Sequence, residues 1–532
     1  MIRRAAALAA LLLAMSGAGA GARAQSTDSL RAPVRKRTIA EDLLMFSQVL
    51  NQIRVNHPDT LDPHDLLMAA IQGMVQAADP HSFVIPAERL DPARQKAMDD
   101  GKLVPVPITF GYTEGAPLVV AVAPGSRAVG LDILPGDELV AADGHPIAAA
   151  SPNELDLALA GAPGSSVKLQ FVRRRLDGSL ARLDRTVQRE KMDEASAVPV
   201  AMMLDSTTGY VRVTTFEGDK VADELHSALG TLEDRGMKGL VLDLRDNGGG
   251  RVDQAADIAG EFLPRGDVVY TSTGRKQSMI DTVRVGRSFW RSERKYPVVL
   301  LVNRGTASAS ELVAGALQDH DRALIVGRPT FGKSLIMRGF PLTDGSVMVL
   351  VVGWMKTPCG RVIQRQYRGT SRREYFEQAG AASDTAGRPS CHTDGGRVVY
   401  GGGGIVPDVL LPSSLAAPEW LARLNESGTV LTWASGYVSA NEAALANVDS
   451  LAASPRLPAA ALTEFRAYAA KAGVNIPRDS ASEDWLQRAL VGEVAFVKFG
   501  DAGFYRMVAL TDGAVKKAVA EMGRAAGLGG GR

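Results

Sequence analysis

The chain has 532 residues, 45% of them hydrophobic, and its 60 basic and 59 acidic side chains leave a formal net charge of +1. This length is enough for several domains with sizeable cores. A charge so close to neutral argues against a general nucleic-acid-binding protein, which usually carries a clustered basic surface. The seven histidines and two cysteines show no spacing typical of metal ligands, so we predict no metal and no other cofactor.

The N-terminus has the pattern of an export signal. Arg3 and Arg4 precede an apolar run over 5–15 that is too short to span a bilayer comfortably, and a small-residue cleavage pattern ends at Ala24. We therefore expect residues 1–24 to be a signal peptide and the mature chain to be periplasmic, with or without membrane association. An uncleaved membrane anchor is the alternative.

Residues 25–101 are predicted to form a linker and a helical segment. Apolar residues recur at helical spacing over 39–55 and again over 65–77, and a loop with His81 follows. No residue in the sequence pattern pairs with His81. We interpret it as structural, and a catalytic histidine is the alternative.

Residues 103–192 carry short strand-like runs separated by glycine turns. A run with Phe110, Gly111 and Tyr112 comes first, Pro-Gly and Asp-Gly turns follow, and then a short helical run. In this order the features resemble a PDZ domain. The resemblance implies that Phe110, Gly111 and Tyr112 lie in the carboxylate-binding loop and its strand, where a peptide adds to the sheet edge. A generic small β domain is the alternative.

Residues 195–413 alternate strand and helix patterns. Apolar runs over 209–216, 239–244 and 298–302 predict strands, and 221–232 predicts a helix between the first two. Strands that alternate with helices favour a mainly parallel sheet. The predicted fold class is multidomain α/β, with an inserted β domain and additional helices at both ends.

Ser308 lies where the strand 298–302 gives way, through a loop of small residues, to a helix with one apolar face. Free N–H groups and the helix dipole favour negative charge at a helix start, so an oxyanion formed by attack of Ser308 would be stabilised there. Lys333 follows a second apolar run, 324–326, at a strand–turn junction. On this local pattern alone, a structural βαβ unit with a surface lysine is an equal alternative.

Two short motifs carry the serine and the lysine: Thr306-Ala307-Ser308-Ala309-Ser310-Glu311 and Thr330-Phe331-Gly332-Lys333. Together they resemble the C-terminal processing peptidases, or tail-specific proteases, of family S41. The resemblance implies a protease core related to ClpP and crotonase, with Ser308 as nucleophile and Lys333 as its base. Thr306 and Ser310 are the competing hydroxyls, and they are structural on this alignment.

A glycine loop follows the strand 239–244 and contains Gly248 and Gly249. Glycines let the backbone approach a ligand without a side-chain clash. The resemblance implies that the N–H of Gly248 or Gly249 joins the N–H of Ala309 in an oxyanion hole. An ordinary strand-to-helix turn is the alternative.

The chain departs from the family at one position. The family usually has a glutamine four residues after the lysine, where this chain has Met337, and a thioether is a weak acceptor. A lysine base must be neutral, so Lys333 should lie in a dry pocket. Either Ser308 and Lys333 suffice, or Ser334 or Gln364 substitutes, or activity is weak.

Residues 327–334 also match the phosphate-loop pattern G-x-x-x-x-G-K-[ST]. A phosphate loop should open a helix, whereas the segment after Lys333 is short and is interrupted by Gly339. We therefore favour the peptidase interpretation of this lysine.

Cys359 and Cys391 are an even pair in a chain expected to be exported, which suggests a disulfide. Two buried free thiols are the alternative. A polar insertion over 365–400 could be a lid, a contact arm or decoration. Residues 414–532 are alanine-rich and predict a helical accessory domain.

The predicted function is that of an exported serine endopeptidase that cleaves unfolded or C-terminally exposed polypeptides recruited by its PDZ domain. Its partners would be protein or peptide substrates and no nucleic acid; a regulatory protein partner and a homo-oligomer are left open. A catalytically weak PDZ scaffold, motivated by Met337, is the main alternative. A crotonase-like acyl-CoA enzyme is a third possibility.

Overall fold

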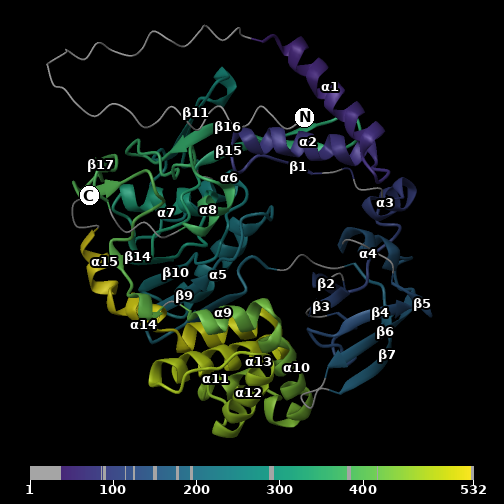
Figure 1. Ribbon diagram of the computed structural model, residues 1–532. Helices are drawn as coiled ribbons and strands as arrows, with labels where there is room; N and C mark the ends of the chain where they lie inside the picture. Colours follow the sequence, from purple (N-terminus) through teal and green to yellow (C-terminus); the bar gives the residue numbers. More distant parts are fainter. Residues whose placement is uncertain are drawn as a thin grey trace, which may run out of the picture. The chain divides into compact units, whose positions relative to one another are not determined.

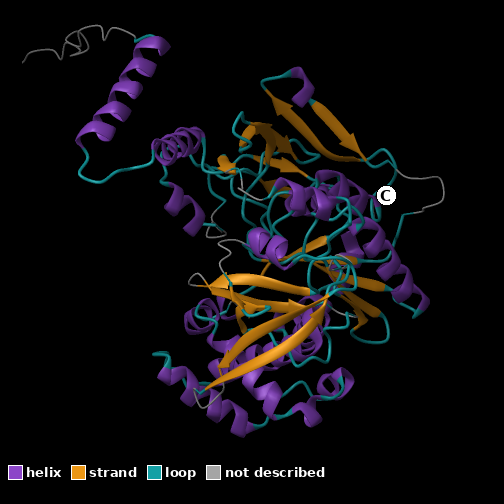
Figure 2. Cartoon of the chain, turned by 90° about the vertical axis from the view of Figure 1, so that its right-hand side faces the viewer, coloured by secondary structure: helices purple, strands orange, loops and turns teal. Residues whose placement is uncertain are grey.

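The computed structural model describes residues 37–85, 87, 91–113, 116–123, 126–147, 152–174, 179–191, 196–286, 293–379, 385–415 and 417–528. The protein is a mixed α/β multidomain chain, as Figures 1 and 2 show. It divides into two compact units, Met1–Gly73 and Met74–Arg532. The predicted signal peptide, 1–24, lies outside the described residues.

The first unit contains α1 (Ile39–Asn56) and most of α2 (Pro63–Ala78), which confirms the two helices predicted there. Helix α1 begins at a capping box, in which the Thr38 hydroxyl accepts from the Glu41 N–H and the Glu41 carboxylate accepts from the Thr38 N–H. This exchange satisfies two backbone donors at the helix start.

The second unit is built around a six-stranded sheet with the strand order β19-β14-β13-β10-β9-β8. Its strands are β8 (Val200–Met203), β9 (Thr208–Arg212), β10 (Gly239–Asp243), β13 (Val298–Val302), β14 (Leu324–Gly327) and β19 (Val409–Leu410). All neighbours are parallel except β8 and β9. Strands β9, β10 and β13 are buried at every position, as expected for a parallel sheet covered on both faces.

In the described part of the chain, three helices cover one face of this sheet, and two helices with Ala509 from the end of a third cover the other. The first set is α5 (Val221–Asp234), α6 (Val252–Gly260) and α7 (Ala309–Asp319), and the second is α14 (Gly513–Ala520) and α15 (Met522–Leu528). Alternate strand residues face the two sets: Leu300 packs with α7, and Val299 packs with Val515 of α14. The last two helices, predicted within the segment 414–532, therefore complete the core sheet. The predicted domain boundaries themselves stay predictions.

A second, antiparallel sheet flanks the core. It consists of β1 (Phe83–Ile85), β11 (Val268–Gly274), β12 (Asp281–Arg284), β15 (Leu335–Pro341) and β16 (Val347–Lys356). Strand β1 pairs with β16 and brings the His81 loop to this part of the chain. Strand β15 begins two residues after Lys333, where a phosphate loop would need a helix.

An antiparallel sheet fills the segment in which a PDZ domain was predicted. Its order is β2 (Ile108–Thr113), β3 (Ala116–Val122), β4 (Glu138–Ala142), β6 (Ser166–Arg174) and β7 (Leu180–Gln188), with β5 (His145–Pro146) on β4, and the helices α3 (Pro92–Asp99) and α4 (Pro152–Leu159) accompany it. Positions 110–112, expected to include a loop, are all in β2 and pair with β3. The Phe110 side chain is buried in the core beneath the sheet, and β2 is an edge strand.

Most of the C-terminal segment is a helical bundle. It contains α9 (Glu419–Glu426), α10 (Thr429–Ala440), α11 (Val448–Ala453), α12 (Ala459–Lys471) and α13 (Ser480–Thr511). Trp433 is fully buried between Tyr437 and Phe465, with ring centroids 4.9 and 5.2 Å away. Helix α13 is interrupted at Gly500, which has a φ of +66°. No helix in the described part of the chain is both long and apolar enough to cross a bilayer.

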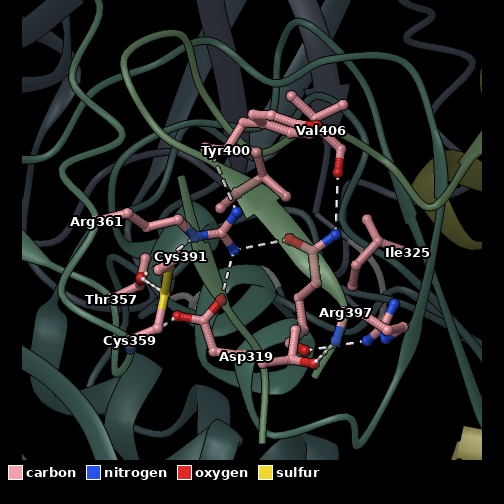
Figure 3. Close-up of polar contacts among 12 residues, drawn as sticks. Asp319, Ile325, Thr357, Cys359, Arg361, Cys391, Arg397, Tyr400 and Val406 are labelled. Atoms are coloured by element: carbon pink, nitrogen blue, oxygen red, sulfur yellow. Dashed lines mark hydrogen bonds and ion pairs between the residues drawn. A yellow bond between two sulfur atoms is a disulfide. The ribbon is translucent and has the colours of Figure 1, made fainter. Parts of the chain in front are cut away.

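The insertion folds into α8 (Arg372–Glu377), β17 (Ser390–His392) and β18 (Val398–Tyr400). The predicted disulfide is present: Cys359 and Cys391 are bonded, with their Cα atoms 6.1 Å apart. Beside it, Asp319 at the end of α7 accepts from Arg361 Nη2 at 2.6 Å and from the Cys359 N–H at 3.1 Å (Figure 3). Both charged side chains are 1% exposed, so a buried ion pair holds the end of α7 to the segment that precedes the insertion.

The buried ion pair should make a measurable contribution that an exposed pair does not. Arg361→Met leaves the Asp319 carboxylate buried without its counter-charge and should lower the free energy of unfolding by about 3–5 kcal/mol. Arg373→Met is the matched control, because Arg373 and Glu377 are 88% and 60% exposed, and its cost should be below about 1 kcal/mol. Urea unfolding measures both, and equal costs would contradict this account.

Candidate active site

Ser308 is the N-cap of α7, directly after the loop that leaves β13. Its φ is +57°, a left-handed conformation that non-glycine residues adopt rarely and that concentrates at functional sites. Of the three hydroxyl-bearing residues between positions 306 and 310, Thr306 and Ser310 are fully buried, whereas Ser308 is partly exposed. The Thr306 hydroxyl donates to the Leu244 carbonyl at 2.8 Å, so its role is to hold the loop.

The Glu311 carboxylate joins the serine loop to the lysine loop. Its Oε2 accepts from the N–H groups of Ser308, at 2.9 Å, and Lys333, at 2.8 Å. Its Oε1 accepts from the Gly332 N–H at 2.8 Å and from the Thr330 hydroxyl. Ser308 and Lys333 are therefore both bonded to one oxygen atom of a fully buried side chain.

Burial controls the charges in this site. It raises the pKa of Glu311 to about 7, although the four donors pull the pKa down. Burial also lowers the pKa of Lys333, against the opposing charges of Glu311 and Glu217. Desolvation disfavours an ammonium group, so the environment of Lys333 shifts it toward the neutral form that a base needs.

The lysine loop is fixed at each of its backbone positions. The Phe331 N–H donates to the Thr306 carbonyl at 3.0 Å, and the Ser334 N–H donates to Gln364 Oε1 at 3.0 Å. The Gly332 and Lys333 N–H groups bind Glu311. A phosphate would meet a buried carboxylate in place of free amides, so the match to a phosphate loop is a coincidence of sequence.

The glycine loop touches the serine loop closely. A Cβ on Gly249, which has a φ of +95°, would lie 2.7 Å from the Ala307 carbonyl oxygen and 2.8 Å from the Ala309 nitrogen. The Gly249 N–H donates to Asn247 Oδ1 at 2.9 Å. A Cβ on Gly248 would have nothing within 4 Å. Ala309 is the first residue of α7, where the N–H has no intrahelical partner.

Tyr375 lies in the polar insertion, where no sequence motif marks it as a functional residue. Its hydroxyl is 2.8 Å from His81 Nε2 and accepts from Gln364 Nε2 at 2.9 Å. Burial, with the Lys333 charge adding to it, lowers the pKa of His81 to about 4. Met337 lies in β15 and pairs with Val351.

No group of three or more histidine, cysteine or acidic side chains within the described ranges could hold a metal ion. The predicted oxyanion residues Gly249 and Ala309 lie beside Ser308, whereas Phe110, Gly111 and Tyr112 lie on a separate sheet. The Ser334 hydroxyl, one candidate substitute for the missing glutamine, is buried with no hydrogen-bond partner among the described residues.

The family profile of Peptidase family S41 matches residues 207–371. A carboxy-terminal-processing protease of Bartonella bacilliformis is 31% identical over 61% of this chain and 73% of its own length. A carboxyl-terminal-processing protease of Synechocystis sp. is 36% identical over 45% of this chain and 55% of its own length.

Among solved structures, a photosystem II D1 C-terminal processing protease is 24% identical and covers 71% of this chain and 94% of its own, with a TM-score of 0.33.

The raised pKa of Glu311 predicts how stability depends on pH. Between pH 4.5, the ordinary value, and about 7, the folded chain holds a proton that the unfolded chain has lost. The contribution of Glu311 to stability is therefore complete below pH 4.5 and falls as the pH rises through 7. Glu311→Gln cannot titrate and should flatten this part of the profile of unfolding free energy.

The control is Glu377→Gln, which changes an exposed carboxylate and should leave the profile unchanged. Urea unfolding at several pH values between 4 and 8 measures the three proteins. Parallel profiles for the wild type and Glu311→Gln would show that Glu311 titrates normally.

Proposed function

This chain belongs to peptidase family S41 and is a serine-type peptidase, and we propose that it uses Ser308 as nucleophile and Lys333 as general base. The observation that carries the proposal is the shared Glu311 carboxylate, which binds the N–H groups of both residues. The partial exposure of Ser308, between the buried residues Thr306 and Ser310, supports the same choice of nucleophile.

In this mechanism neutral Lys333 takes the proton of the Ser308 hydroxyl as its oxygen attacks the scissile carbonyl carbon. Lys333 then returns the proton to the leaving amine, and water hydrolyses the acyl-enzyme by the reverse sequence of proton transfers. General acid–base catalysis of this kind contributes about 10²–10⁴-fold. The lowered pKa of Lys333 supports this role because it increases the neutral fraction.

We assign the oxyanion hole to the N–H groups of Ala309 and Gly248. The free N–H at the start of α7 supports the first donor. The second is Gly248 in preference to Gly249, because the Gly249 N–H is already bonded to Asn247. Gly249 then serves to let the glycine loop approach Ser308.

We propose that substrates are unfolded or C-terminally exposed polypeptides of an exported environment, recruited by a PDZ domain at residues 103–192. The open edge of β2 supports recruitment by strand addition. Because Phe110 is a core residue, the backbone at Gly111 and Tyr112 would bind the peptide. We also propose that residues 1–24 are an export signal. The core is proposed to be related to ClpP and crotonase.

Loss of either proposed catalytic side chain should abolish hydrolysis. Ser308→Ala and Lys333→Ala should each reduce cleavage of casein by about 10³-fold or more, because both act in one proton-transfer step. Ser310→Ala is the matched control, two residues away in the first turn of α7, and should retain activity. An inactive wild type that still binds peptides would favour the scaffold alternative, and an active Lys333→Ala would assign the base elsewhere.

Substitution of the two glycines of the glycine loop by alanine should have different effects on the cleavage rate. Gly249→Ala brings a Cβ within 3 Å of the Ser308 Cβ and should lower the casein cleavage rate by about 100-fold, as a displaced nucleophile would. Gly248→Ala keeps its N–H and meets no neighbour, so its rate should be close to wild type. The reverse order would contradict the assigned geometry.

A further inference from the structure

We propose that Tyr375 and Gln364 are positioning residues for Lys333 and together take the place of the glutamine that Met337 replaces. The proposal rests on the role of Lys333 as base. It assigns a function to the insertion, which supplies Tyr375 from α8.

Gln364 binds the backbone next to the lysine. Its Oε1 accepts from the Ser334 N–H at 3.0 Å, and its Nε2 donates to the Arg365 carbonyl at 2.9 Å and to the Tyr375 hydroxyl at 2.9 Å. The carboxamide is thus bonded on both its oxygen and its nitrogen. Because Glu311 accepts from the Lys333 N–H and Gln364 accepts from the Ser334 N–H, the two peptide groups on either side of the Lys333 Cα are both held.

Tyr375 determines the orientation of Gln364. The Tyr375 hydroxyl accepts from Gln364 Nε2, so its own proton is available for the other neighbour, His81 Nε2, at 2.8 Å. This direction requires His81 to be neutral, with its ring proton on Nδ1, and a low pKa is consistent with that state. The resulting chain runs from Ser334 through Gln364 and Tyr375 to His81, which is 294 residues away from Tyr375.

Ring contacts hold Tyr375 against the lysine loop. Its ring centroid is 6.1 Å from that of Phe331, and the Arg365 guanidinium carbon lies 4.2 Å from the centre of the Tyr375 ring. The backbone N–H of Arg365 also donates to the Gly332 carbonyl at 2.9 Å. Tyr375 is 1% exposed, so its hydroxyl is removed from water and the hydrogen bonds it makes are not in competition with solvent.

The variant Tyr375→Phe tests the proposal, because it removes the hydroxyl and keeps the ring. We expect kcat for a quenched-fluorescence peptide to fall by about 10- to 100-fold, the size of a misplacement of a reacting group by about 1 Å, while KM stays within about twofold. Tyr367→Phe is the matched control: its ring lies 6.2 Å from that of Tyr375 in the same insertion, and it should keep the wild-type kcat.

A double-mutant cycle with Gln364→Leu separates positioning from a general loss of packing. Tyr375→Phe and Gln364→Leu break the same chain, so the double variant should be no slower than the slower single variant. The proposal would be overturned if the effects of the two substitutions on kcat multiply in the double variant. It would also be overturned if kcat falls only in variants that a thermal melt shows to be unfolded at the assay temperature. A wild-type kcat for Tyr375→Phe would overturn it as well.

These outcomes can be told apart from a failure of the proposed function. If Lys333→Ala remains active, the base is a different group and the mechanism fails. If Lys333→Ala is inactive while Tyr375→Phe and Gln364→Leu match the wild type, the mechanism stands and the positioning role alone is wrong.

Discussion

The hydrogen bonds to the Glu311 carboxylate are the interaction on which the active site depends. A carboxyl group taken out of water is costly unless it is fully bonded, and the Glu311 oxygens collect three N–H groups and one hydroxyl. Two of the N–H groups belong to Ser308 and Lys333. One buried side chain thereby links the β13–α7 junction to the β14–β15 junction, which carry the proposed nucleophile and the proposed base.

Helix α7 keeps Ser308 in position because contacts hold the helix at both of its ends. At its start, Ser308 adopts a left-handed conformation, and the glycine loop presses against it without the space for a Cβ at Gly249. At its end, Asp319 is paired with Arg361 beside the disulfide. Strain at the first residue can persist only where the surroundings over-determine the conformation, and the two ends of α7 provide that constraint.

The sequence pattern predicts the strands of the core but not the structure of the insertion. The core strands follow apolar runs of ordinary length, whereas the insertion is polar and without periodicity, yet it buries Tyr375 against Phe331. A segment without a motif therefore packs against the loop that carries the proposed base.

The sequence by itself determined the elements and the position of the two motifs. Apolar runs predicted β10 and β13, small residues predicted the turn at Ser308, and the paired cysteines predicted the disulfide. These features depend on neighbours in the chain, and local periodicity records them. The match to the phosphate-loop pattern shows the limit of sequence patterns. The same residues fit a phosphate loop and a peptidase loop, and only the hydrogen-bond partner of the Lys333 N–H distinguishes the two.

Only the tertiary structure decided which partners those groups have. The second face of the core sheet is covered by α14 and α15, and His81 lies against Tyr375. The tertiary structure also made Glu311, a residue within the serine motif, the common acceptor for the lysine loop. Each of these outcomes is a contact between segments distant in sequence, and no pattern along a single segment specifies the other member of such a pair.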